Sequence, residues 1–426
     1  MKAKMWLWTA VAILVAGMMA GAVWWKLRPQ VILLGDGTKL RLVAVTYGKH
    51  HNFPGNRVPV RANRRNGALD STNDTLFVWI EQQHKGNQWP NYQVLAYDQA
   101  ATACAGNWGS GGGMRQIKNG VELVGVRLDA FPRHDRKISL RFVSWGTHGR
   151  QVAKGQMVIP NPARGGSFES WTPESLPDVQ SDGDLDVTLT KLVYGVPGFN
   201  GGDHSSKDPM NKAVLAAFHT EQKGVVITNW QPTRIETSDA TGNHVYNNSW
   251  SNGHDDNGDA TMTYQWGLWP DEPAWKLRVE MSRVSGFSDD EMWTAQNVPV
   301  HAGRQQDLWN YGGRNRQTGP AFAETTLNGI HLKLFPAVQF TDQNPGNGEK
   351  AGGVRVTTEP DLPEGYRLTV IATDETGHPL RGWGPNGGGG NYVAQFPDLG
   401  NSTTLNITLA LHKSRFVEYT VKPTKE

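Results

Sequence analysis

The sequence predicts an all-β protein in which an N-terminal transmembrane helix is followed by three tandem antiparallel β-sandwich modules. Three observations lead to this prediction. The chain of 426 residues contains 49 glycines and 24 prolines, which favours many turns and short strands over long helices. Apolar and polar residues alternate in several short segments, as they do in strands that bury one face. An uncharged apolar stretch opens the chain.

That apolar stretch runs from Met5 to Trp25 and is 21 residues long. A helix of this length spans about 30 Å, the thickness of the hydrocarbon core of a bilayer. Tryptophans stand at both of its ends, where aromatic rings favour the membrane interface. A second interpretation is open, because the A-x-A pattern at 20–22 resembles a signal-peptide cleavage site. The sequence therefore predicts a membrane anchor over residues 1–28, or secretion after cleavage near Ala22.

Charge and cysteine content restrict the location and the partners. Cys104 is the only cysteine, so no internal disulfide can form, which fits a bacterial envelope better than a eukaryotic secretory route. The short tail before the apolar stretch favours export of the large body behind it. The net charge is +2 and no long basic block occurs, so we expect no nucleic-acid partner. The body is expected outside the cytoplasm, in the periplasm or at the cell surface.

The exported body contains one sequence plan three times. Each copy has an aspartate, then a tryptophan, then a polar run with glycine; the tryptophans are Trp108, Trp250 and Trp383. Because matched positions imply one structural role, we expect these three rings in hydrophobic cores. The Asp-x-x-Gly runs at Asp239 and Asp374 follow apolar strands. They predict turns in which the aspartate bonds its own backbone and the glycine takes a positive φ.

An alternating strand follows an aromatic–proline pair in each copy: "ISLRF" from Ile138, "WKLRVEM" from Trp275 and "LNITLAL" from Leu405. Period-two alternation places the apolar side chains of each strand on one face of a sheet. Each copy then closes near a proline, so the aromatic–proline pair, the strand and the closing proline recur in the same order. We interpret this order as an internal repeat.

The size of the copies and the places where alternation stops predict the domain boundaries. Units of about 100 residues with several short strands are typical of an antiparallel β-sandwich. We predict modules and linkers in the order 35–160 module, 161–183 linker, 184–300 module, 301–327 linker and 328–423 module.

This arrangement resembles the tandem immunoglobulin-like or fibronectin-III-like modules of bacterial envelope proteins. The resemblance covers the exported body as a pattern, and the Cys–Trp–Cys framework of a true immunoglobulin domain is missing. It implies a non-enzymatic binding or scaffolding role with a protein or glycan partner outside the cytoplasm. Two alternatives stay open: a carbohydrate-active enzyme or carbohydrate-binding accessory protein, and a structural subunit of an envelope complex.

The most charged loop of the chain is a candidate calcium site, because it offers several oxygen ligands. The candidate ligands are Asp255, Asp256, Asn257 and Asp259. Their spacing does not match an EF-hand, so a solvated hairpin tip is the alternative. No other cofactor is expected.

Tryptophans outside the matched strands are candidates for sugar binding, since flat aromatic rings suit the C–H faces of pyranoses. These candidates are Trp89, Trp171, Trp293 and Trp309. No G-x-S-x-G or H-E-x-x-H motif occurs, so the sequence identifies no catalytic residue.

Overall fold

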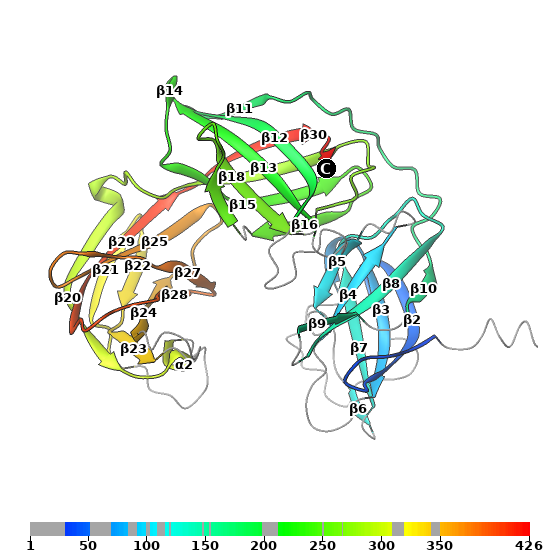
Figure 1. The fold of residues 1–426 in the computed structure, drawn as a ribbon, viewed down its shortest axis with the longest axis horizontal. Coiled ribbons are helices and arrows are strands. Elements are labelled where there is room, and N and C mark those ends of the chain that lie inside the picture. The colour runs from blue at the N-terminus through cyan, green and yellow to red at the C-terminus, as the bar shows by residue number, and fades with distance from the viewer. Residues whose placement is uncertain are drawn as a thin grey trace, which may run out of the picture.

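The computed structural model describes residues 30–51, 70–83, 92–98, 103–108, 116–118, 121–146, 149–152, 155–197, 212–248, 251–265, 267–308, 319–341 and 350–426. Strands dominate these residues and pair mostly in antiparallel sheets, so the all-β prediction is confirmed. The only helical segments in this part of the chain are the short turns η3 (Asp289–Glu291) and α2 (Gln305–Leu308). Figure 1 shows the strands in three groups along an arch.

The predicted membrane helix from Met5 to Trp25 lies outside the described residues, so it stays a prediction. Within the ranges given above, no helix is long and apolar enough to cross a bilayer.

The first group of strands, called the first unit here, covers residues 30–160. Its strands are β1 (Val31–Leu33), β2 (Lys39–His50), β3 (Asp70–Gln83), β4 (Tyr92–Tyr97), β5 (Ala103–Trp108), β6 (Gln116–Lys118), β7 (Val121–Leu128), β8 (Lys137–Gly146), β9 (Gly149–Val152) and β10 (Met157–Pro160). One sheet has the order β1-β2-β3-β7-β6, and the other has the order β10-β8-β4-β5 with β9 on β8. Apolar side chains from both sheets, such as Val78 and Phe142, form a common core.

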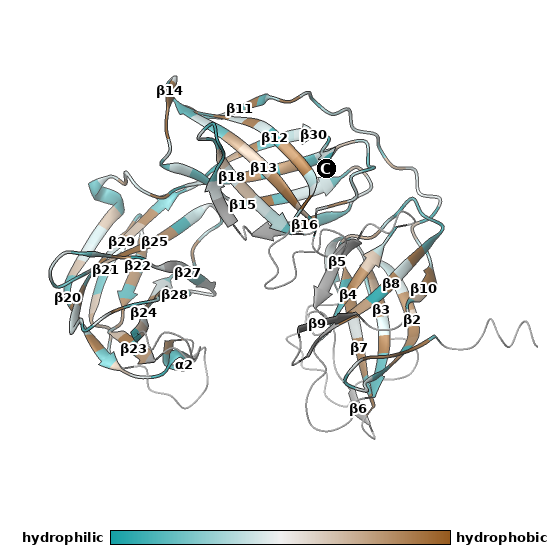
Figure 2. Ribbon diagram, viewed as in Figure 1, coloured by the Kyte–Doolittle hydropathy of each residue, from teal (hydrophilic) through white to brown (hydrophobic). Residues whose placement is uncertain are grey.

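The second unit begins after an extended segment. Its strands are β11 (Asp178–Asp182), β12 (Leu185–Pro197), β13 (Lys212–Gln222), β14 (Val225–Val226), β15 (Trp230–Asp239), β16 (His244–Asn248), β17 (Ser251–His254), β18 (Ala260–Gln265) and β19 (Trp275–Arg283). One sheet has the order β11-β12-β13-β18-β17, with β14 on β13. The other contains β16, β15 and β19 in that order. Hydrophobic and polar residues alternate along these strands in Figure 2.

The third unit follows η3. The strands of this part of the chain are β20 (Met292–Ala302), β21 (Ala323–Leu327), β22 (Ile330–Leu334), β23 (Ala337–Thr341), β24 (Lys350–Glu359), β25 (Tyr366–Asp374), β26 (Pro379–Leu380), β27 (Trp383–Gly388), β28 (Asn391–Phe396), β29 (Thr404–Lys413), β30 (Arg415–Val421) and β31 (Thr424–Lys425). Two sets of these strands repeat the two orders of the first unit: β21-β22-β24-β28-β27 and β20-β29-β25-β26. Strand β23 joins the two sets, because it pairs with β24 of the first set and, in parallel, with β20 of the second.

The edge strands of the second and third units are exchanged. In the first unit the last strand, β10, comes after β8 and the short β9, and it pairs with β8 itself. The strand that follows β19 is β20, but β20 pairs with β29 of the third unit. The strand that follows β29 is β30, and β30 pairs with β19 of the second unit. Figure 1 shows β30, in red, among the green strands of the second unit.

The exchange divides the chain differently from the boundaries expected from sequence. The predicted ranges 184–300 and 328–423 assign β20 to the second module and β30 to the third, the reverse of their hydrogen bonding. The predicted linkers 161–183 and 301–327 also contain β11 and β21, which pair with β12 and β22. Alternation identifies a strand but not its partner, because the choice of partner is a tertiary contact.

The turns predicted at Asp239 and Asp374 are confirmed. Asp239 Oδ1 accepts hydrogen bonds from the backbone N–H groups of Thr241 and Asn243 at 2.9 and 3.2 Å. Asp374 Oδ1 accepts from the N–H groups two and four residues later at 2.8 and 2.9 Å. The glycine three positions after each aspartate has a φ of 91° and 89°, respectively. A residue with a Cβ rarely adopts this conformation, which explains the glycine.

The structure does not test the core role expected for the matched tryptophans. Trp108 and Trp383 end β5 and begin β27, but their side chains lie outside the described part. Trp250 lies outside it entirely. The prediction that these rings fill cores therefore stays open.

Candidate functional site

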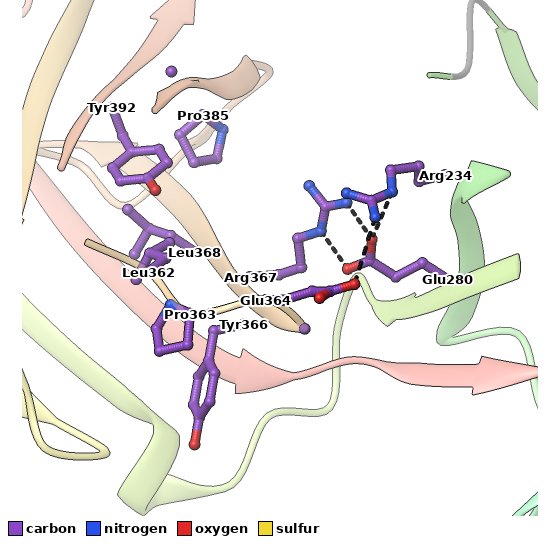
Figure 3. A pocket seen from close by; sticks show the side chains of 12 residues that line it. Arg234, Glu280, Leu362, Pro363, Glu364, Tyr366, Arg367, Leu368, Pro385 and Tyr392 are labelled. Atoms are coloured by element: carbon purple, nitrogen blue, oxygen red, sulfur yellow. Dashed lines mark hydrogen bonds and ion pairs between the residues drawn. The ribbon is translucent and has the colours of Figure 1, made fainter. Parts of the chain in front are cut away.

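The candidate site is a cleft of about 230 Å³ at the junction of the second and third units. Strands β15 and β19 of the second unit supply Arg234 and Glu280, and the third unit supplies the other lining residues. Figure 3 shows charged side chains on one side of the cleft and apolar ones on the other. The cleft is therefore amphipathic and is built by both units.

Glu280 is the centre of the charged wall. Glu280 follows the core residue Val279 on β19, so its side chain points to the opposite face of the sheet. The residue is nevertheless buried, with 3% exposed. Arg367 of β25 donates from Nε to Oε1 at 2.7 Å and from Nη2 to Oε2 at 2.5 Å. Burial alone would raise the pKa of Glu280, but Arg367, together with Ser414 and Arg234, outweighs burial and holds the pKa below its usual value. The pair connects the second unit to the third.

Cross-strand pairs extend this charged wall over the sheet of the second unit. Arg234 lies opposite Glu280 in the β15–β19 ladder, and Glu236 lies opposite Arg278. Opposite charges at facing positions of antiparallel strands attract one another. Arg278 Nη1 lies 3.3 Å from Glu236 and 2.9 Å from Glu364 of the third unit. The charges balance within this group, so the wall holds the junction together without a large net potential.

The apolar wall comes from the third unit alone. It includes Leu362 and Leu368, the rings of Tyr366 and Tyr392, and Pro385. Tyr392 and Leu362 also pack against the hydrophobic core of that unit. The apolar wall is therefore held in place by the hydrophobic core of the third unit.

The carboxylates of the cleft are poorly suited to glycoside hydrolysis. A glycosidase needs one carboxyl group with a raised pKa as general acid and a second as nucleophile or base. Glu280 has a lowered pKa and both of its oxygens bonded to Arg367. The other carboxylate of the lining, Glu364, has 65% of its side chain exposed and pairs with Arg278. This arrangement suits recognition and attachment better than proton transfer.

No known protein family matches this chain. A scan against models of protein families gives no match, and a search of curated proteins gives none.

A second polar cluster joins the first and second units. Arg133 of the first unit is buried, with 3% exposed, and its Nε donates to Asn243 Oδ1 of the second unit at 3.0 Å. Its Nη2 donates to the carbonyls of Asp74 and Gly242 at 2.8 and 3.0 Å. Its guanidinium lies 4.8 Å from the centre of the Phe131 ring. A single cluster of buried apolar residues also runs through both units, so this joint is packed as well as bonded.

The predicted calcium ligands do not converge on one point. Asp255 Oδ1 accepts from the N–H groups of Asn257 and Asp259 at 2.9 and 3.0 Å, which closes the turn. The carboxylate of Asp259 is directed elsewhere, toward Thr190 Oγ1 at 3.0 Å and His219 Nδ1 at 2.9 Å. In the described part of the chain, no three His, Cys, Asp or Glu side chains are grouped to hold a metal. The hairpin-tip alternative accounts for these bonds, and Asp256 is exposed there; calcium binding stays a prediction.

The predicted sugar-binding tryptophans are separate from the cleft. Trp171 is partly exposed in the segment before β11, with Lys276 Nζ 5.1 Å from its ring centre. Trp293 of β20 packs against the core of the third unit. Trp89 and Trp309 lie outside the described residues. Neither Trp171 nor Trp293 lines the cleft. Sugar binding by the four tryptophans stays a prediction.

Sequence reasoning missed both clusters between units. Glu280 and Arg367 are 87 residues apart, and Arg133 and Asn243 are 110 residues apart. Charged residues on the outward face of a strand normally face solvent, so Glu280 gives no local signal of burial. One local signal was available, because Asn243 directly follows the turn predicted at Asp239.

Proposed function

We propose that this chain is a single-pass, membrane-anchored protein whose exported part is a stiff, non-enzymatic scaffold for binding outside the cytoplasm. The anchor in this proposal is the apolar stretch from Met5 to Trp25. The observation that carries the scaffold role is the exchange of β20 and β30 between the second and third units.

The exchange favours a fixed geometry over a flexible string of domains. Domains joined by one linker move relative to one another unless their interface is large. Here two strands cross between the units, and each pairs over several residues with the other unit's sheet. The Glu280–Arg367 pair adds a buried side-chain contact at the same junction. A rigid pair of units suits a protein that presents a binding surface of fixed geometry to a partner.

The finer architecture in the proposal is a tandem array of immunoglobulin-like β-sandwich modules. Its support is that all three units repeat two strand orders, β1-β2-β3-β7-β6 and β10-β8-β4-β5 in the first unit. Residues from both sheets of a unit contribute to one buried cluster, as two packed sheets would.

The lining of the cleft favours binding over catalysis. The carboxylate Glu280 is held in its charged form by Arg367, which leaves no general acid there at neutral pH. A protein or glycan partner could use the tyrosines and the charged rim as a recognition surface. A carbohydrate-binding accessory role therefore stays within the proposal, and a glycosidase role has no support from this cleft.

A structural subunit of an envelope complex is a second candidate, favoured by exposed valines on one sheet of the second unit. Val225 and Val226 of β14 are 64% and 59% exposed, and Val179 of β11 is 57% exposed. Large exposed apolar side chains on a sheet edge are typical of surfaces that meet other proteins.

Cutting the chain between the exchanged strands tests the scaffold role. A protease site is inserted between the exposed residues Gly319 and Pro320 of the full chain. After cleavage, β20 stays on the N-terminal piece and β30 on the C-terminal piece, although each is paired with the other piece. We expect the pieces to elute together in size-exclusion chromatography and to separate only in denaturant.

The control is the same cleaved chain with Tyr419→Ala, which weakens β30 in the second unit. Its pieces should come apart at a lower denaturant concentration. Separation of the unsubstituted pieces in buffer alone would remove the basis of the rigid scaffold.

A further inference from the structure

In the joint between the first and second units, a buried carboxyl group has a largely exposed imidazole as its ion-pair partner. Glu272 precedes β19 in the second unit and is 8% exposed. Its nearest cationic partner is His134 of the first unit, whose Nε2 lies 3.4 Å from Glu272 Oε2. The imidazole has 58% of its side chain exposed, so solvent competes for it. This contact crosses from one unit to the other.

The other charged groups around the joint do not compensate Glu272. Asp239 of β15 is 2% exposed and its charge opposes ionisation of Glu272, as does that of Asp135 in the first unit. The buried cation Arg133 bonds Asn243, whose Nδ2 in turn donates to Asp239 at 2.8 Å. Arg133 and Asp239 thus balance one another, and an ionised Glu272 adds one uncompensated negative charge. Burying such a charge is costly.

We propose that the joint between the first and second units is a pH-sensitive hinge, closed when Glu272 is protonated and loosened when Glu272 ionises. The carboxyl and the imidazole of His134 lie within reach of one shared proton, which removes the excess charge. This inference holds whether or not the chain is an anchored scaffold. For a scaffold outside the cytoplasm, it would make the position of the first unit depend on the external pH.

The direction of the response follows from the protonation of Glu272 in the two states. Burial, followed by the charge of Asp239, raises the pKa of Glu272 from 4.5 to about 7 in the closed joint, against the opposing effect of His134. In the open joint the group is solvated and its pKa moves toward the ordinary value, while Asp239 of the same unit stays near it. Closure is therefore fully favoured below about pH 4.5, and this contribution is lost as the pH rises through about 7. The ratio of closed to open joints changes by roughly 300-fold at most.

Single-molecule energy transfer on the full chain in detergent micelles tests the hinge. Dyes are attached through Gln83→Cys and Val225→Cys, two exposed positions on different units, with Cys104→Ser removing the native cysteine. We expect a narrow distance distribution at pH 5.5 and a broad one at pH 8.5. Glu272→Gln should keep the distribution narrow at both pH values, because an amide carries no charge.

Two further variants separate the hinge from a general effect of pH. His134→Ala removes the cation that favours ionisation, so the midpoint of the broadening should move to higher pH. Asp271→Asn is the matched control, since Asp271 is the exposed neighbour of Glu272 that pairs with Lys425, and it should broaden as the unsubstituted chain does. A distance distribution that does not change with pH would overturn the proposal. So would one that broadens in Glu272→Gln as much as in the unsubstituted chain.

Discussion

At the scale of single residues, the junction of the second and third units depends on Glu280. This carboxylate is 3% exposed and takes both of its short hydrogen bonds from Arg367. Such a pair is weak evidence for net stability, because both charges lose water. Breaking it is different, since one buried charge then remains without its best partner.

Arg367→Ala should lower the free energy of unfolding by about 3 kcal/mol at pH 7. The lowered pKa of Glu280 means that the pair contributes above the ordinary carboxyl pKa and that this contribution is lost as the pH falls through the lowered value. The difference between the variant and the unsubstituted chain should therefore shrink in acid. Urea denaturation at several pH values measures it.

Arg367→Lys is the matched control for charge, because it keeps the cation and loses the two-point geometry. We expect a loss between that of Arg367→Ala and zero. A penalty that stays constant from pH 7 to pH 3 would show that Arg367 acts through packing and not through Glu280.

At the scale of elements, the sequence predicts where strands and turns lie, but it does not predict which strands pair with one another. Alternation identifies the strands near Ile138, Trp275 and Leu405, and the Asp-x-x-Gly run identifies the turn at Asp239, because both signals are local. The pairing of β30 with β19 depends on which edge is free in the folded molecule, and that is not local. The cleft was unpredictable for the same reason, since Arg367 and Glu280 meet only after the exchange.

Tyr419→Ala tests the place of β30 in the second unit. Tyr419 is 1% exposed, lies in the core shared by the first and second units, and donates to the Val187 carbonyl of β12 at 2.8 Å. Truncation of a large buried ring costs about 3–5 kcal/mol. Hydrogen exchange should show lost protection in β12 and β19.

Tyr419→Phe is the control, because it removes only the hydroxyl group and should cost about 1 kcal/mol. Lost protection confined to β25 and β29 in Tyr419→Ala would place β30 with the third unit and refute the exchange.

At the scale of the whole molecule, the two joints of the arch differ in kind. The second and third units share strands, so their relative position is fixed by backbone hydrogen bonds. The first and second units meet through side chains, among them Arg133 and Glu272, and through packed apolar residues. We therefore expect motion of the first unit against a stiff pair formed by the other two. With an N-terminal anchor, that motion would occur next to the membrane.

The anchor itself can be tested by fractionation and mass. The full chain should stay in the membrane pellet after alkaline carbonate extraction, and a chain without residues 1–28 should not. Intact mass then distinguishes a retained helix from cleavage near Ala22. A soluble mature protein that lacks the first 22 residues would favour the secretion alternative.

The exchanged strands also determine the order in which the units complete their sheets during synthesis. A ribosome makes β19 before the third unit, yet the neighbour that covers β19, β30, is made only after all of the third unit. The middle of the arch is therefore the last part to be completed, and until then its sheet has an open edge that can pair with other chains. Ribosome stalling or proteolytic trimming after Lys413 would damage the centre of the molecule, while the first unit, made earliest, would keep all of its own strands.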